Sequence, residues 1–118
     1  MLCCVPLNDD GSIDPRWGRA RRVALARVEG GAITEWTDVE VGWDALKDAG
    51  AEGAHHARVA RFLRERGVDV VLAHHMGRDM HHMLGRMGVV VWLGAAGDAR
   101  PAVLAAATEG VAGSGGPE

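Results

Sequence analysis

The feature that most constrains the fold of this chain is an alternation of short apolar runs with helical stretches in its second half. Residues 68–73 form a continuous run rich in β-branched side chains, and residues 89–93 repeat the pattern. Each run follows a stretch whose apolar residues have helical spacing, at 55–66 and at 78–87. Continuous apolar strands that follow helices are typical of parallel strands covered on both faces. The pattern therefore predicts a sheet with buried parallel strands and packed helices.

The first half of the chain predicts three strands. Residues 1–7 are apolar and end in the turn-rich segment 8–12. The glycine turn Glu29-Gly30-Gly31 is typical of a hairpin, so the second and third strands are expected to be antiparallel neighbours. The remaining expected elements are strands over 22–28 and 32–41, a loop over 42–53 with one helical turn around Asp44–Asp48, and a helix over Ala99–Thr108. This order, β-β-β-α-β-α-β-α, favours an α/β fold with a mixed five-stranded sheet.

Composition limits the classes of function. A chain of 118 residues, 47% of them apolar, fits one domain, which we expect over 1–110, with a disordered tail over 111–118. The net charge of −3 argues against a nucleic-acid partner. Because no signal peptide or membrane-length apolar run is found, we expect a cytoplasmic protein without a membrane partner. Cys3 and Cys4 are expected to be buried thiols that point to opposite faces of their strand.

The histidines are the unusual residues, because all six occur in adjacent pairs. The pairs are His55-His56, His74-His75 and His81-His82. Neutral imidazole is a good ligand for Zn, Cu, Ni and Fe, and three or four histidines with a carboxylate or thiolate complete a metal site. The alternative is that each histidine is a surface or capping residue, which is the commoner role of a single histidine.

Several segments, taken in order and spacing, resemble the dinitrogenase iron-molybdenum cofactor biosynthesis (NifX/NafY-like) domain family. The matching segments are Val5-Pro6, Ser12-Ile13-Asp14-Pro15-Arg16-Trp17-Gly18-Arg19-Ala20, Gly53-Ala54-His55-His56-Ala57-Arg58-Val59-Ala60, Gly67-Val68-Asp69-Val70-Val71 and Met76-Gly77. The resemblance covers nearly all of 1–110. It implies a three-layer ribonuclease-H-like fold with about three helices and strand order 3-2-1-4-5, in which only strand 2 is antiparallel. It also implies binding of a metal or metallocluster.

With that strand order, all three histidine pairs come to the carboxyl edge of the sheet, where open α/β sheets usually bind ligands. The candidate metal ligands are therefore His55, His56, His74, His75, His81 and His82. The loop after the first strand reaches the same edge, so Arg16, Trp17 and Arg19 are candidates for gripping an anionic cofactor. The expected cofactor is a transition metal (Fe, Cu, Zn or Ni) or a molybdenum or iron-sulfur cluster.

Two functions fit these residues. The first is a small metal- or metallocluster-binding carrier with a protein acceptor for the cluster. The alternative is a metal-dependent enzyme acting on a small molecule, with Asp79 or Asp10 as ligand or general base. Nuclease action is rejected because the first strand, Leu2-Cys3-Cys4-Val5, carries no carboxylate for divalent cations. A homodimer stays open, since so small a chain would need one to enclose an enzyme pocket.

Overall fold

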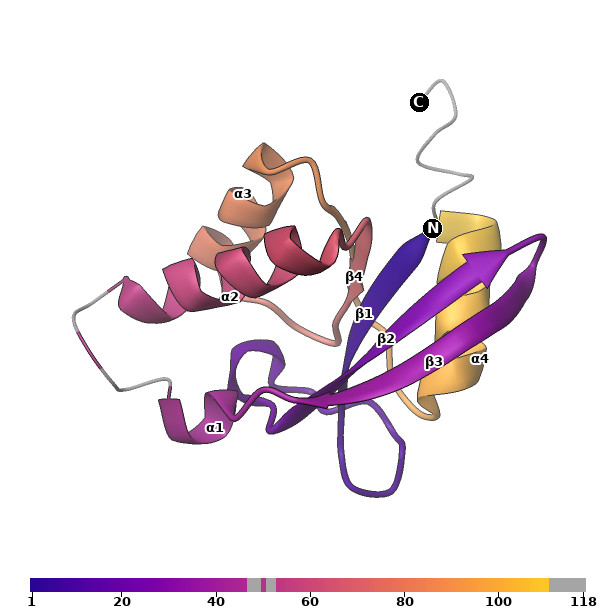
Figure 1. Ribbon diagram of the computed structural model, residues 1–118, viewed down its shortest axis with the longest axis horizontal. Helices are drawn as coiled ribbons and strands as arrows, with labels where there is room; N and C mark the ends of the chain where they lie inside the picture. The colour runs from indigo at the N-terminus through magenta and orange to yellow at the C-terminus, as the bar shows by residue number, and fades with distance from the viewer. Residues whose placement is uncertain (47–49, 51–52, 111–118) are drawn as a thin grey trace.

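A computed structural model of the chain describes residues 1–46, 50 and 53–110. Over these residues the chain forms one mixed sheet with helices packed on both faces (Figure 1). The strands are β1 (Leu2–Leu7), β2 (Arg22–Glu29), β3 (Ala32–Glu40), β4 (Val70–Leu72) and β5 (Val90–Trp92). The helices are α1 (Trp43–Leu46), α2 (Ala54–Arg66), α3 (Arg78–Arg86) and α4 (Ala99–Ala105), with a 3-10 turn η1 (Trp17–Arg19) and a π turn η2 (Ala106–Gly110).

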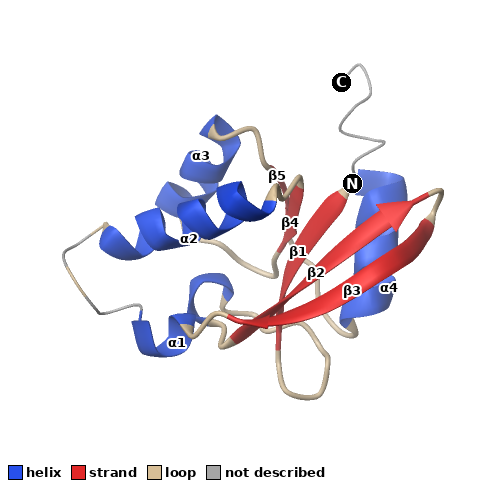
Figure 2. Cartoon of the chain, viewed as in Figure 1, coloured by secondary structure: helices blue, strands red, loops and turns tan. Residues whose placement is uncertain are grey.

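The strand order is β3-β2-β1-β4-β5, as expected (Figure 2). β2 runs antiparallel to both of its neighbours, whereas β4 is parallel to β1 and to β5. The loop after β1 and the starts of α2 and α3 therefore meet at one edge of the sheet. Among the described residues, no helix is long and apolar enough to cross a membrane.

Two apolar clusters separate the three layers, because neighbouring residues of a strand point to opposite faces. Cys4 belongs to the cluster under α2 and α3, together with Leu63 and Leu84. Cys3 belongs to the cluster under α4, with Val103. Both thiols are fully buried and free, which confirms the expected placement of the cysteines.

Most of the predicted element boundaries agree with the structure. The helix predicted over 55–66 ends at Gly67, whose φ of 69° and amide bonds to the carbonyls of Leu63 and Arg64 form a glycine C-cap. The strand predicted over 68–73 is shorter, since Val68 N–H still bonds to the end of α2 and the Asp69 carboxylate accepts the N–H of Leu2. The tail 111–118 and Asp48 of the predicted helical turn lie outside the described residues.

One sequence prediction was wrong. Residues 89–93 were expected to form a strand buried on both faces, but β5 is the edge strand of the sheet. Val90 is 36% exposed and Leu93, just beyond the strand, is 43% exposed. An apolar run is buried only where other parts of the protein cover it, and β5 has no further strand beyond it among the described residues. The third helix was predicted over Ala99–Thr108. In the structure the α-helical part, α4, ends at Ala105, and a π turn follows over Ala106–Gly110.

Candidate functional site

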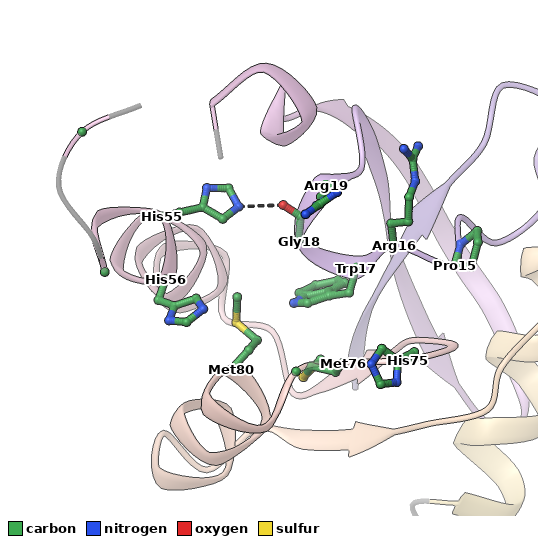
Figure 3. Close-up of a pocket in the computed structure, with 13 residues that line it drawn as sticks. Pro15, Arg16, Trp17, Gly18, Arg19, His55, His56, His75, Met76 and Met80 are labelled. Carbon is green, nitrogen blue, oxygen red and sulfur yellow. Dashed lines mark hydrogen bonds between the residues drawn. The ribbon is translucent and has the colours of Figure 1, made fainter. Parts of the chain in front are cut away.

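A pocket of about 750 Å³ lies where the loop after β1 meets the starts of α2 and α3 (Figure 3). Its described lining residues are Pro15, Arg16, Trp17, Gly18, Arg19, Gly50, Gly53, His55, His56, His75, Met76, Gly77 and Met80. All three residues predicted to grip an anionic cofactor, Arg16, Trp17 and Arg19, are among them. The pocket lies at the carboxyl edge of β1 and β4, as predicted from the strand order.

Asp14 holds Arg16, which lines the pocket in the loop after β1, and sequence reasoning did not single out Asp14. Its carboxylate is 3% exposed and accepts hydrogen bonds from the N–H of Arg16 at 2.9 Å and from Arg16 Nε at 3.2 Å. These bonds raise the pKa of the Arg16 guanidinium above its ordinary value. The backbone of Arg16 also pairs with that of His75, which joins the loop after β1 to the loop after β4. The only sequence signal was a carboxylate two residues before an arginine, a common pattern.

Trp17 forms the floor of the pocket and is 3% exposed. Its ring packs edge-on against Trp43, with ring centroids 5.3 Å apart and an interplanar angle of 70°. Within the described part of the chain, the buried indole Nε1–H has no hydrogen-bond partner. Figure 3 shows this nitrogen turned towards the side where His56 and Met80 lie. A buried donor without a partner is costly, so it marks a place where a ligand atom would be stabilised.

The structure brings three of the six histidines to this pocket. His55 and His56, at the start of α2, and His75, in the loop after β4, line it. His55 Nε2 lies 2.6 Å from the carbonyl oxygen of Gly18, so this ring is tied to the η1 turn (Figure 3). His56 and His75 stand on different walls of the pocket.

The other three histidines lie elsewhere. His81 and His82 are exposed and line a separate hollow on α3 with Arg78, Gly85 and Arg86. The side chain of His74 is exposed and lines neither of these hollows. Across residues 1–46, 50 and 53–110, no group of three His, Cys, Asp or Glu side chains could hold a metal ion. Coordination of a metal by any of these histidines stays a prediction.

The other candidate ligands also lie outside the pocket. Asp10 accepts hydrogen bonds from the N–H and Oγ of Ser12, which lower the pKa of its carboxyl, and it lines a different hollow. Asp79 is exposed on α3 and does not line the pocket. Burial raises the pKa of Cys3 to about 11 and raises that of Cys4 further, so both remain neutral thiols in the core.

Solved structures share this fold. The apo form of the orange protein from Desulfovibrio gigas is 20% identical, with a TM-score of 0.69 over 92% of this chain and 88% of that one. A Thermotoga protein described as a NifB candidate is 21% identical, with a TM-score of 0.61 over 92% and 88% of the two chains. A candidate dinitrogenase from Methanocaldococcus jannaschii is 10% identical, with a TM-score of 0.65 over 93% and 89%. At these identities the likeness shows the fold alone.

The sequence itself assigns the family. Among curated proteins, none matches the chain. The family described as dinitrogenase iron-molybdenum cofactor matches residues 1–110, which include all of the described strands, helices and pocket-lining residues. The chain therefore belongs to the dinitrogenase iron-molybdenum cofactor family.

Proposed function

We propose that this protein is a small carrier that holds an anionic metal-sulfur cluster as cargo in the pocket beside Trp17. The observation that carries the proposal is the charge of the walls. The ionisable residues among the described lining residues are two arginines and three histidines, with no carboxylate and no thiol among them. The whole chain has more acidic than basic residues, 16 against 13, so this local excess of cationic side chains favours an anion.

The kinds of group in the pocket suit a cluster held mainly by non-covalent contacts. Arg19 and Arg16 offer planar, permanently charged donors, although the charge of Arg16 is partly offset by Asp14. The Trp17 Nε1–H offers a further donor, and Met80 offers a polarisable thioether to the same pocket. His56 is a candidate imidazole ligand for a metal atom at the surface of the cargo.

Family membership supports a metallocluster as the class of cargo, because the family is named for the iron-molybdenum cofactor. A carrier also needs a protein acceptor, to which the cluster passes intact. An open pocket at the edge of the sheet, with its cationic groups on loops and helix starts, suits reversible loading.

The direct test uses tetrathiomolybdate, a sulfur-rich molybdenum dianion, as the probe. The protein is incubated with the probe and desalted, and molybdenum, acid-labile sulfide and protein are measured together with the visible spectrum. We expect about one bound probe per chain, with its colour retained at low salt and lost at high salt because charges dominate the binding. Retention of stoichiometric zinc with no molybdenum and no acid-labile sulfide would contradict a cluster carrier.

A matched pair of double variants separates the pocket from the overall charge. Arg16→Gln with Arg19→Gln removes two cationic side chains from the pocket, whereas Arg78→Gln with Arg86→Gln removes two from the exposed hollow on α3. We expect the pocket variant to bind the probe at least tenfold more weakly and the α3 variant to bind within about threefold of wild type. Equal losses in both would show that the probe responds only to net charge.

A further inference from the structure

Both ring nitrogens of His55 are already used inside the protein. Nε2 lies 2.6 Å from the carbonyl oxygen of Gly18, and Nδ1 lies 3.0 Å from Nη1 of Arg58. A carbonyl oxygen can only accept and a guanidinium can only donate, so Nε2 carries the proton and Nδ1 accepts. This single neutral tautomer satisfies both partners. A metal bound at either nitrogen would have to displace one of these hydrogen bonds.

The same contacts join three segments that are far apart in the sequence. Gly18 lies in the η1 turn, 37 residues before His55 at the start of α2. Arg58 Nη1 also donates to the carbonyl oxygen of Leu46 at the end of α1, at 3.0 Å. The ring of Trp43 in α1 stands edge-on to the His55 ring, with centroids 6.4 Å apart. His55 is therefore the point at which η1, α1 and α2 are tied together.

Gly18 stands between two residues of the pocket, so its hydrogen bond to His55 bears on the position of both. Gly18 is flanked in the chain by Trp17 and Arg19, the residues that offer an indole donor and a guanidinium to the pocket. Holding the Gly18 carbonyl fixes the short turn between them. Figure 3 shows His55 reaching across to this carbonyl, whereas the His56 ring is turned to the other side of the helix start.

We infer that His55 is a positioning residue of the cargo pocket and not a ligand of the cargo: its imidazole holds the Gly18 carbonyl and thereby orients Trp17 and Arg19. This inference rests on the proposed function for its consequence, but the contact that carries it lies within the protein itself. It separates the two members of the first histidine pair, since among the described residues His56 makes no hydrogen bond to the η1 turn.

The test compares His55→Gln with His55→Leu. Glutamine keeps an amide N–H that can donate to Gly18 and an amide oxygen that can accept from Arg58, but it has no imidazole. Leucine keeps the bulk and removes both hydrogen bonds. We expect His55→Gln to bind tetrathiomolybdate within about threefold of wild type and His55→Leu to bind at least tenfold more weakly. A His55→Gln variant that is folded and yet binds tenfold more weakly than wild type would overturn the inference.

Near-ultraviolet circular dichroism gives a second readout that needs no probe. The coupled rings of Trp17 and Trp43 report the position of the η1 turn against α1. We expect the spectrum of His55→Gln to match wild type and that of His55→Leu to change. Should leucine prevent folding, the glutamine variant alone decides both readouts. Failure of the wild-type protein to bind the probe would refute the proposed carrier, whereas a changed spectrum in His55→Gln would refute the positioning role.

Discussion

Replacing Trp17 with phenylalanine should separate stability from cargo binding. The substitution keeps an aromatic ring at a site that is 3% exposed and removes the Nε1–H, which has no partner among the described residues. In most proteins, shrinking a buried tryptophan lowers stability. Here the removed group is itself an unfavourable one, so two contributions of opposite sign compete.

The magnitudes nearly cancel. Complete truncation of a buried tryptophan to alanine costs about 3–5 kcal/mol, and the change to phenylalanine removes about a third of those atoms, which gives a loss of about 1–1.7 kcal/mol. Leaving a buried donor without a partner costs about 1–3 kcal/mol, and the variant is relieved of that cost. Without the probe, the free energy of unfolding of the protein should therefore fall by no more than about 0.7 kcal/mol and can rise by up to about 2 kcal/mol.

Cargo binding should change in the opposite direction, because a hydrogen bond to a charged group contributes about 1.5–3 kcal/mol. We expect tetrathiomolybdate to bind at least tenfold more weakly to Trp17→Phe. Urea unfolding of the empty protein and equilibrium dialysis of the probe measure the two effects. Trp92→Phe is the matched control, since it removes the same atoms from a partly buried tryptophan that packs on the other face of the sheet and does not line the pocket. A drop of more than 2 kcal/mol in stability for Trp17→Phe, with unchanged affinity, would refute the reasoning.

Three further predictions concern the stability of the fold and the contact between Asp14 and Arg16. Gly67→Ala should lower the free energy of unfolding by about 1 kcal/mol because Gly67 has a φ of +69°, whereas Gly85→Ala, within helix α3, should raise it by about 0.5–1 kcal/mol. An added Cβ meets no atom within 4 Å at either position, so both effects should come from the backbone. Changes of the same sign for both variants in urea unfolding would contradict this origin. Burial raises the pKa of Cys3 from 9.0 to about 11, so the thiol ionises at lower pH in the unfolded chain than in the folded protein. The free energy of unfolding should therefore decline as the pH rises from 9 towards 11. Urea unfolding at each pH measures this decline, and a flat profile would contradict it. Asp14→Asn should lower stability by only about 1 kcal/mol, because the Arg16 side chain is 62% exposed, and should also weaken probe binding; unchanged binding would show that Asp14 does not orient Arg16.

The fold could be predicted in large part because its signals are local. Apolar runs, glycine turns and helical spacing gave the order of the elements, and the resemblance gave the strand order, which the structure confirms. The errors came where burial depends on distant parts of the chain. Residues 89–93 are as apolar as residues 68–73, yet of the two strands that these runs form, β4 lies between β1 and β5 whereas β5 lies at the edge of the sheet. Nothing in the run itself distinguishes a central strand from an edge strand.

The sheet topology predicts which segments form the candidate site, but it does not predict which side chains of those segments face it. Strand order brings the loop after β1 and the starts of α2 and α3 to one edge, and this correctly grouped Trp17 with His55 and His75. It does not fix the rotation of a helix about its own axis. In α3 the buried positions are Met80 and Leu84, and at about 100° per residue His81 and His82 then turn to the solvent side.

The decisive features of the pocket are contacts between residues that are far apart in the sequence. The two ring nitrogens of His55 are assigned by a carbonyl 37 residues away and by a guanidinium one turn along α2. A count of histidines treats every imidazole as an available ligand, whereas coordination needs a free lone pair that points into the site. In this family member, His55 lines the pocket, yet its lone pair is already committed to Arg58, so the composition of the pocket and the availability of its donors have to be judged separately.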